Sequence, residues 1–325
     1  MSGSSLGSVF HSALGASFDH FSPKLGDSMQ QAITKAAALV EAHEYIRRFE
    51  GKTIVVKVGG SIMDDPATLN AIIMDICFLD AVGMRPIIVH GGGKSISEAM
   101  RQAGLEPRFV QGRRYTDEAT LVIAERILAN EVNAAIVREI KRLEHRAMAL
   151  HSLTSCVVFA KPLQLDVPAT ATDPAQQGVD IGFVGEVTSV NAELLNALLE
   201  TECIPVIAPI ARDAAGGKLN VNADSVAGHV AAAVRAEKLV LVSDTHGIRT
   251  DPDDPDSLAS SLTRAQIQEL VDRGVVTSGM LPKVEASYTA LEGGVTKTHI
   301  IDGRIAHSLL LEVYTTQGIG TEITL

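Results

Sequence analysis

The pattern that most constrains the fold is a strand, a glycine turn and a helix, repeated twice in succession. The β-branched run at residues 53–58 leads straight into Gly59-Gly60, and the Asp-Asp-Pro segment at 64–66 then opens a helix. A second apolar run at residues 86–89 leads into three glycines at 91–93 and another helix start. Strands that alternate with helices in this way are typical of a parallel sheet covered on both faces. We therefore predict an α/β fold with a mainly parallel central sheet.

The same alternation continues over the rest of the chain. Helices are predicted near residues 33–49, 117–147, 191–202, 222–237 and 264–273, and strands near 156–160, 183–187, 204–208, 239–242 and 298–301, with a last strand ending at 325. Hydrophobic residues make up 46% of the 325 residues, aromatic residues make up only 4%, and Trp is absent. We therefore expect an aliphatic core. The length of the chain is at the upper end of the range for one two-lobed domain.

Charge and cysteine content exclude several classes of function. The formal net charge is −11 and the basic residues are scattered, so nucleic acid and anionic membranes are not expected partners. No apolar run approaches the roughly 18 residues that a membrane span needs. Cys77, Cys156 and Cys203 lie far apart, without a C-x-x-C spacing or a nearby His cluster. They are interpreted as reduced core residues of a cytoplasmic protein without a metal site of its own.

The N-terminal region is predicted to be a tail followed by a helix. The first 22 residues are rich in Ser and Gly and contain no Lys or Arg, unlike a signal or transit peptide. We interpret residues 1–28 as a flexible tail. The alternative is a short helix that docks on its own or a neighbouring subunit, because apolar residues recur at helical spacing between Phe10 and Phe21. A helix over 29–50 follows, with an apolar stripe near its end.

Two lysines at glycine-bearing turns point to the chemistry. Lys57 stands just before Gly59-Gly60, and Lys283 stands just after Gly279. Backbone N–H groups at glycine turns, together with two cations, suit an anion whose charge spreads over several oxygens during reaction, as in phosphoryl transfer. The sequence therefore predicts a kinase.

The spacing of the glycines excludes two familiar nucleotide-binding motifs. The segment from His90 to Ser95 ends in Gly-Lys-Ser, but the first glycine of a Walker A motif would fall on Ile88. The turn at Gly59-Gly60 does not continue as the G-x-G-x-x-G of a dinucleotide fold, because Ile62 and Asp64 follow it. The glycine turns therefore indicate another kind of phosphate-binding α/β protein.

Six segments follow one another along the chain: Lys57–Ser61, His90–Gly93, Gly112–Thr116, Asp180–Val187, Asn220–Asp224 and Gly279–Ala286. In this order they resemble the amino acid kinase family, in particular its members that act on N-acetyl-L-glutamate. The likeness runs from about residue 38 to residue 325. It implies a three-layer α/β/α sandwich over 51–325, with a substrate lobe at 51–210 and a nucleotide lobe at 211–325. The activity that it implies is ATP-dependent phosphorylation of the side-chain carboxylate of N-acetyl-L-glutamate, in arginine biosynthesis.

The resemblance also implies roles for individual residues. The catalytic residues would be Lys57, Lys283 and Asp224, with the two lysines flanking the γ-phosphoryl group and Asp224 fixing them in place. The substrate-binding residues would be Gly92, Gly93, Arg114 and Asn220; the fork of the arginine suits an α-carboxylate. The nucleotide-binding residues would be Gly59, Gly60, Asp244 and Lys283. Mg2+ would arrive on the nucleotide phosphates.

Part of the nucleotide half departs from the family pattern. The segment 243–248 reads Ser-Asp-Thr-His-Gly-Ile where the family usually has Thr-Asp-Val-x-Gly-Val, so the purine contacts stay open. His246 is interpreted as a loop residue. His90 and His229 are interpreted as packed or capping residues, because a substrate carboxylate is already a nucleophile and needs no base.

Two further segments resemble family members that are inhibited by arginine. In those members an N-terminal helix interlaces dimers into a ring-shaped hexamer, and the helix at 29–50 resembles it. The run 297–304 and the residues after it resemble their arginine site. The residues implied for L-arginine are Tyr45, Lys297, His299, Glu312 and Gly318. Without this function, the two segments would be only a packed helix and a surface turn.

Other functions remain open at this point. The nearest is a kinase for a longer acyl-amino diacid, such as an aminoadipate derivative in lysine synthesis, because one methylene is worth only ~1–3 kcal/mol. Aspartokinase and glutamate 5-kinase fit less well, since no appended regulatory or RNA-binding-like domain is expected. A non-catalytic arginine-sensing subunit is disfavoured by the presence of Lys57, Asp224 and Lys283 together.

Overall fold

The structure, a computed structural model, describes residues 27–165, 180–277, 279–315 and 318–325 of the chain. The chain divides into two compact units, 1–45 and 46–325. The described part of the first unit belongs to α1 (Asp27–Phe49), which ends in the second unit. The tail predicted for residues 1–28 therefore lies, up to residue 26, outside the described residues, as does the alternative helix between Phe10 and Phe21.

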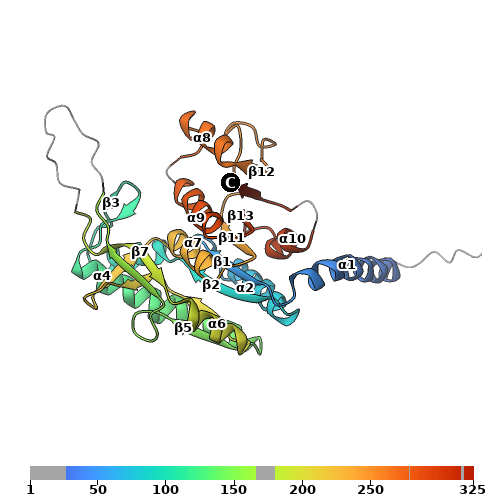
Figure 1. Cartoon of the computed structure of the whole chain (residues 1–325), viewed down its shortest axis with the longest axis horizontal. Helices are drawn as coiled ribbons and strands as arrows, with labels where there is room; N and C mark the ends of the chain where they lie inside the picture. Colours follow the sequence, from blue (N-terminus) through green and yellow to red (C-terminus); the bar gives the residue numbers. More distant parts are fainter. Residues whose placement is uncertain (1–26, 166–179, 278, 316–317) are drawn as a thin grey trace, which may run out of the picture. The chain divides into compact units, whose positions relative to one another are not determined.

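The second unit is built on an eight-stranded sheet (Figure 1). In spatial order its strands are β12 (Ser261–Thr263), β14 (Thr321–Thr324), β13 (Lys297–Asp302), β11 (Lys238–Ser243), β1 (Thr53–Val58), β2 (Arg85–His90), β8 (Ile204–Ile207) and β5 (Ala147–Leu150). All neighbouring strands are parallel except the pair of β13 and β14, which is antiparallel. The prediction of an α/β fold with a mainly parallel sheet is confirmed.

Two groups of helices pack on this sheet. In one group, α7 (Ala223–Ala233) contacts β1, β2 and β11, and α9 (Leu281–Glu292) contacts β11 and β13. In the other group, α2 (Pro66–Ala81), α5 (Ala134–Arg142) and α10 (Ser308–Tyr314) contact β2, β5 and β13 respectively. The remaining helices include η2 (Ile62–Asp64), α3 (Gly93–Gln102), α6 (Ala192–Glu200) and α8 (Arg264–Asp272). Because helices cover both faces, the central strands are continuous apolar runs, and Lys57 is a buried charge within one of them.

The close packing of α7 on α9 depends on a glycine. A Cβ atom added to Gly228 of α7 would lie 2.6 Å from the backbone oxygen of Ala286 in α9. Only a glycine permits this approach of the two helices. The approach positions the site described below, because the first turns of α7 and α9 carry Asp224 and Lys283.

A small barrel stands beside the main sheet. Its strands are β10 (Lys218–Val221), β7 (Val184–Val190), β6 (Val158–Pro162) and β9 (Ile210–Arg212), and a hairpin of β3 (Phe109–Val110) and β4 (Arg113–Arg114) is separate from it. The closure of the barrel was not predicted from the sequence, because its pairing is set by contacts between distant segments.

The single helix predicted over 117–147 is wrong in two respects. It is divided into α4 (Glu118–Glu125), a π-helical segment η3 (Arg126–Asn133) and α5, which ends at Arg142. The left-handed backbone at Glu144, with φ of 66°, turns the chain out of the helix. Residues 147–150 then form strand β5.

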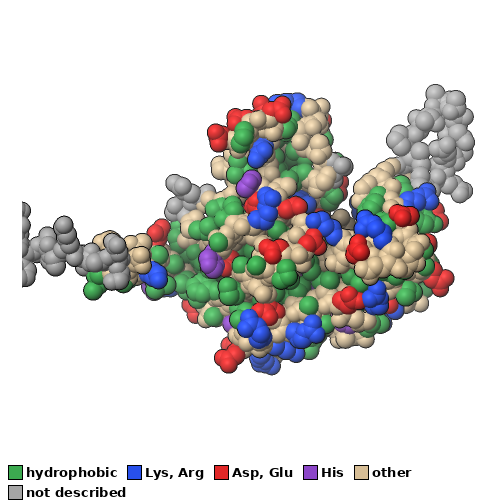
Figure 2. Space-filling model, turned by 180° about the vertical axis from the view of Figure 1, so that it is seen from behind, with side chains coloured by type: hydrophobic (Ala, Val, Ile, Leu, Met, Phe, Trp, Pro, Cys, Tyr) green, Lys and Arg blue, Asp and Glu red, His purple; other side chains and the backbone are tan. Residues whose placement is uncertain are grey.

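The surface carries mixed charge. Acidic and basic side chains are interspersed over the face seen in Figure 2, as the scattered basic residues of the sequence predict. Within the described ranges, no helix is long and apolar enough to cross a membrane.

The carboxyl ends of the central strands meet at one edge of the sheet. Val58 at the end of β1 is paired with His90 of β2 on one side and with Val242 of β11 on the other. The turns that begin at Gly59, Gly91 and Asp244 therefore lie side by side. In open α/β sheets this edge is where ligands bind.

Candidate active site

Two lysines and one aspartate form a buried ionic cluster at this edge. Lys57 Nζ lies 2.8 Å from Asp224 Oδ1, and their side chains are 7% and 9% exposed. Lys283 Nζ lies 3.9 Å from Asp224 Oδ2. Asn222 caps α7 and accepts hydrogen bonds from the backbone N–H groups of Asp224 and Ser225, which fixes the carboxylate at the helix start. Three elements, β1, α7 and α9, thus bring together residues more than 200 positions apart in the sequence.

The cluster carries more positive than negative charge. Burial raises the pKa of Asp224, but the charges of Lys57 and Lys283 and the hydrogen bond from Lys57 outweigh it, so the pKa is lowered. Burial also lowers the pKa of Lys283, and the Asp224 charge opposes this shift. One carboxylate shared by two ammonium groups leaves a cation for a ligand. This arrangement suits a phosphoryl group whose oxygens bear the charge.

The two glycine turns line the same space without side chains. A Cβ on Gly60 would lie 3.4 Å from the backbone nitrogen of Gly93, and a Cβ on Gly92 would lie 2.6 Å from Leu128 Cδ2. Gly92 is the N-cap of α3 and offers no side-chain cap to its first N–H groups. The space around Gly93 is open, since nothing lies within 4 Å of an added Cβ. Free N–H groups at an open helix start fit an anionic ligand.

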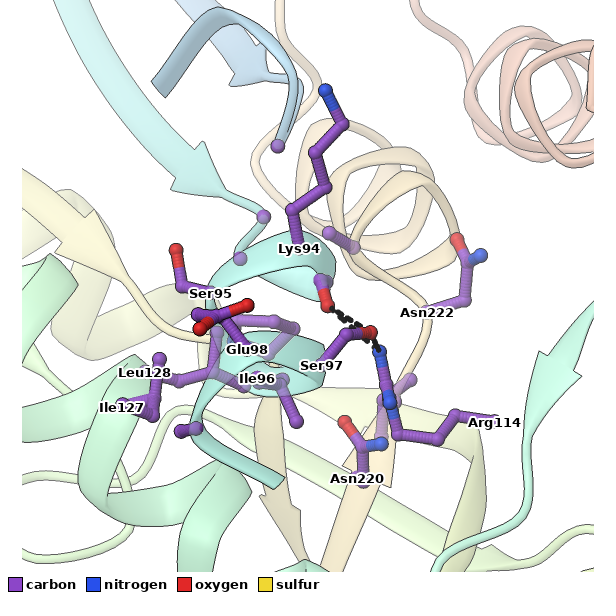
Figure 3. A pocket seen from close by; sticks show the side chains of 18 of the residues that line it. Lys94, Ser95, Ile96, Ser97, Glu98, Arg114, Ile127, Leu128, Asn220 and Asn222 are labelled. Carbon is purple, nitrogen blue, oxygen red and sulfur yellow. Dashed lines mark hydrogen bonds between the residues drawn. The ribbon is translucent and has the colours of Figure 1, made fainter. Parts of the chain in front are cut away.

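Arg114 and Asn220 also line this space (Figure 3). Arg114 is 8% exposed, and its Nη2 donates to Gly93 O and to Ser97 Oγ, both at 2.7 Å. In the described parts of the chain it has no carboxylate partner, and burial lowers the pKa of its guanidinium. Asn220 Nδ2 donates to Thr116 Oγ1 at 3.2 Å. A buried arginine without a carboxylate suits a carboxylate ligand.

These residues line one cavity of about 1020 Å³. Lys57, Gly60, Gly93, Arg114, Asn220 and Asp224 all contribute to its wall. The structure therefore brings Lys57 and Asp224 together with the residues predicted for the substrate, and Lys283 lies next to them through its contact with Asp224. The volume is ample for a small diacid together with a phosphate group.

A second cavity of about 410 Å³ contains Asp244, predicted for the nucleotide, and His246. Burial raises the pKa of Asp244, but hydrogen bonds led by that of Ser61 outweigh this effect and lower it. His246 Nδ1 lies 3.1 Å from Oδ2 of the buried Asp302, which also pairs with Arg304 at 2.7 Å. His246 lies outside helices and strands, as interpreted, and its side chain contacts Asp302. Arg304, which also lines this cavity, was not predicted for the site.

His90 is fully buried at the end of β2. Its Nδ1 lies 2.8 Å from Gly91 O, and its Nε2 lies 3.1 Å from Asn133 Nδ2. Burial lowers the pKa of its imidazole to about 4, so the ring is neutral at physiological pH. This environment agrees with the interpretation of His90 as a packed residue.

Four of the residues predicted for arginine lie around the amino ends of β11 and β13. His299 Nδ1 lies 2.6 Å from Glu312 Oε1, and Glu312 Oε2 accepts the backbone N–H groups of Ile319 and Gly320 at 2.8 and 3.1 Å. A Cβ added to Gly318 would lie 3.0 Å from the same carboxylate, and Lys297 pairs with Glu322 at 2.8 Å.

Lys238, which no sequence pattern indicated, also belongs to this cluster. Its Nζ lies 3.4 Å from His299 Nε2 and 5.3 Å from the ring centre of Phe49. The only signal in the sequence was a lysine at the start of an apolar strand. Tyr45 belongs to α1 in the first unit, so its part in such a site stays a prediction.

The model of the amino acid kinase family matches residues 52–302. The chain is 45% identical over 294 residues to an acetylglutamate kinase of Symbiobacterium thermophilum, covering 90% of this chain and 99% of that protein. It is 41% identical over 300 residues to an acetylglutamate kinase of Methanocaldococcus jannaschii, covering 92% and 99% respectively.

Solved structures share the fold. An N-acetylglutamate synthase from Neisseria gonorrhoeae, complexed with coenzyme A and N-acetyl-glutamate, is similar with a TM-score of 0.77 at 27% identity, over 89% of this chain and 63% of that one. The same synthase complexed with coenzyme A and L-arginine matches with a TM-score of 0.72 at 26% identity, over 89% and 65%. An isopentenyl phosphate kinase, at 18% identity, shares the fold with a TM-score of 0.58 over 84% of this chain and 100% of that one.

Proposed function

Since the chain belongs to the amino acid kinase family, we propose that it transfers the γ-phosphoryl group of ATP to the side-chain carboxylate of N-acetyl-L-glutamate. The product is N-acetyl-L-glutamyl 5-phosphate, an intermediate of arginine biosynthesis. The observation that carries this proposal is the buried cluster of Lys57, Asp224 and Lys283 beside two side-chain-free glycine turns. It is supported by relatives named acetylglutamate kinase that match almost their whole length.

Catalysis in this proposal consists of positioning and charge stabilisation. The substrate carboxylate attacks the γ-phosphorus directly, so no residue has to remove a proton. The bond from the γ-phosphorus to the β–γ bridging oxygen breaks, and ADP leaves with its electron pair. Lys57 and Lys283 offset the charge that develops on the equatorial oxygens, and Asp224 holds both ammonium groups. Gly60 and the N-terminal turn of α3 donate backbone N–H groups to phosphate oxygens. Gly59 only lines the turn, because its N–H already donates to Val242 O at 2.9 Å. Mg2+ bound to the nucleotide phosphates would neutralise part of their charge.

Recognition of the two substrates is divided between the two cavities. Arg114 pairs with the α-carboxylate of N-acetyl-L-glutamate, while Asn220, Gly92 and Gly93 hold the rest of it. Asp244 and Lys283 lie on the nucleotide side. We assign residues 51–210 to the substrate lobe and 211–325 to the nucleotide lobe. The free cysteines among the described residues fit a cytoplasmic enzyme.

We also propose that L-arginine inhibits the enzyme and that α1 assembles it into a hexamer. The Glu312 cluster supports the first part, because a guanidinium can replace His299 as the charged partner of this buried carboxylate. Leu39 and Val40 of α1 support the second part, being 66% and 74% exposed. Deleting residues 1–50 should abolish both the hexamer and the inhibition. A full-length protein that sediments as a dimer and ignores millimolar arginine would refute this regulation alone.

Trapping the acyl phosphate with hydroxylamine tests the main proposal. N-acetyl-L-glutamate, N-acetylaminoadipate, aspartate and glutamate should be compared as acceptors with ATP. Only the first should give rapid hydroxamate formation. Preference for the aminoadipate derivative would reassign the enzyme to a longer diacid. No hydroxamate with any acceptor would favour the non-catalytic arginine-sensing alternative.

A further inference from the structure

Lys94 joins the two glycine turns through an ion pair that the mechanism does not use. It lies in the first turn of α3, directly after Gly93, and its Nζ is 2.8 Å from Asp64 Oδ2. Asp64 ends η2, the short helix that follows Gly59-Gly60. Figure 3 shows the Lys94 side chain extending from α3 away from Arg114. The Gly-Lys-Ser sequence around Lys94 does not form a Walker A motif, so its position requires another explanation.

The position of Lys94 on α3 is unusual for a lysine. The start of a helix carries partial positive charge and favours anions, so a cation in the first turn is unfavourable. Gly92 supplies no side-chain cap, and the first turn of α3 contains no acidic residue. The pair with Asp64 is exposed, with side-chain exposures of 67% and 37%, and such pairs are weak and easily exchanged. The turn therefore presents surplus positive charge.

Lys94 lies within the same cavity as the catalytic cluster. Lys57, Gly60, Asp64 and Lys94 all line it. The hydrogen bond and charge of Asp64 raise the pKa of Lys94, and the charge of Asp244 contributes further. The charge of Lys283 in turn helps to lower the pKa of Asp244. Because its partner Asp64 follows Gly59 and Gly60, which are predicted for the nucleotide, Lys94 lies on the nucleotide side of the cavity, whereas Arg114 lies toward the proposed acceptor side.

We propose that Lys94 is a third phosphate-binding lysine, which pairs with Asp64 in the nucleotide-free enzyme and exchanges Asp64 for the terminal phosphates of the bound nucleotide. This inference rests on the proposed use of ATP. A triphosphate offers more charge and more acceptor oxygens than one exposed carboxylate, so it displaces Asp64. Asp64 then keeps the lysine at the mouth of the cavity between turnovers.

Calorimetric titration with ATP tests the exchange. Lys94→Met should weaken ATP binding about tenfold, as expected for loss of one charge-assisted hydrogen bond, while AMP binding changes little. Lys94→Arg should restore most of the ATP affinity. Asp64→Asn should leave ATP binding unchanged or tighter, because it removes the competing anion. The KM for N-acetyl-L-glutamate should stay near the wild-type value in all three variants.

Lys161→Met provides a matched control. Lys161 is 61% exposed and pairs with Glu186 at 3.2 Å, on the barrel and outside the cavity. An ATP affinity of Lys94→Met equal to that of this control would overturn the proposal. Equal losses in Lys94→Met and Asp64→Asn would also overturn it, since the pair would then only hold the two turns together.

The wild-type protein separates this proposal from the proposed function. If it binds ATP but forms no acyl phosphate, the acceptor assignment fails while the comparison of variants still decides the role of Lys94. If it binds no ATP, both proposals fail.

Discussion

Two buried ionic clusters lie toward opposite ends of the central strands and differ in how completely their charges are paired. At the carboxyl ends, Asp224 is shared by Lys57 and Lys283, beside the open space at Gly93. At the amino ends, Glu312 is held by His299 and by two backbone N–H groups. The first cluster can accept an anion without losing a partner. The second can bind a guanidinium only by exchanging partners that it already has.

This difference matches the two proposed roles. A site that stabilises charge in a transition state works best when its cations are already held in position and are not fully neutralised by carboxylates of the protein. A regulatory site needs two arrangements, and a ligand that favours one of them. The six residues of β11, Lys238 to Ser243, span roughly 20 Å and connect the clusters through one strand. Arginine that rearranged Glu312 would therefore act on the strand that leads to Asp244.

The largest expected effect tests the surplus of cations at the carboxyl ends. Asp224→Asn leaves Lys57 and Lys283 buried without an anion, which should cost about 3–5 kcal/mol of unfolding free energy. Urea unfolding would measure it, with Glu186→Gln as a control in an exposed pair. A stability equal to that of the control would mean that the lysines are not held by Asp224.

A second, smaller effect tests whether Arg114 is reserved for a ligand. Arg114→Lys keeps the charge but loses the planar fork, so N-acetyl-L-glutamate should bind about 30-fold more weakly. ATP should bind almost as before. Arg142→Lys, in an exposed pair with Glu139, is the matched control. Equal losses for both ligands in calorimetry would remove Arg114 from the acceptor site.

The sequence predicted the carboxyl-end cluster far better than its amino-end counterpart. Lys57 and Lys283 stand beside glycine-bearing turns, so local patterns identify them. Lys238 gains its meaning only from strand pairing, which places it opposite Lys297 and close to His299. No local pattern indicates such a contact.

The elements of the fold also differ in how strongly local patterns indicate them. The central strands were predicted because burial on both faces leaves long apolar runs. Strand β5 was not predicted, and the helix was extended to its first residue, Ala147, because the apolar composition continues there. The barrel strands are short, and their closure depends on pairings such as that of Asn220 with Val184. Tertiary contacts, which local propensity does not report, decided these elements.

A third prediction tests the fully paired cluster. Glu312→Gln should weaken inhibition by L-arginine about tenfold, because the guanidinium loses its charged partner. The kcat without arginine should be unchanged. Glu292→Gln, in an exposed pair with Arg264, is the control. Unchanged inhibition in Glu312→Gln, at full thermal stability, would place the arginine site elsewhere.

The smallest expected effect is the acid sensitivity of the two clusters. Burial raises the pKa of both Asp224 and Glu312, but their cationic and hydrogen-bonding partners outweigh this effect. The pKa of Asp224 is therefore lowered from its ordinary value of 3.8, and that of Glu312 from 4.5. The folded state therefore binds these protons less readily than the unfolded state. The stabilisation is complete above about pH 5 and is lost as the pH falls through the lower folded values.

Urea unfolding between pH 3 and 7 should show this loss. The unfolding free energy should be nearly constant down to about pH 5 and then fall. Asp224→Asn should show a shallower fall below about pH 4, because it cannot take up that proton. Identical slopes for the wild type and this variant would show that Asp224 has no lowered pKa.

The most direct test of the account is the turnover of Lys57→Met and Lys283→Met with ATP and N-acetyl-L-glutamate. If the two lysines stabilise charge in the transition state, each variant should lose about 100- to 1,000-fold in kcat, or ~2.7–4 kcal/mol, with a much smaller change in KM. A kcat close to that of the wild type in either variant would contradict the central claim that this cluster performs phosphoryl transfer.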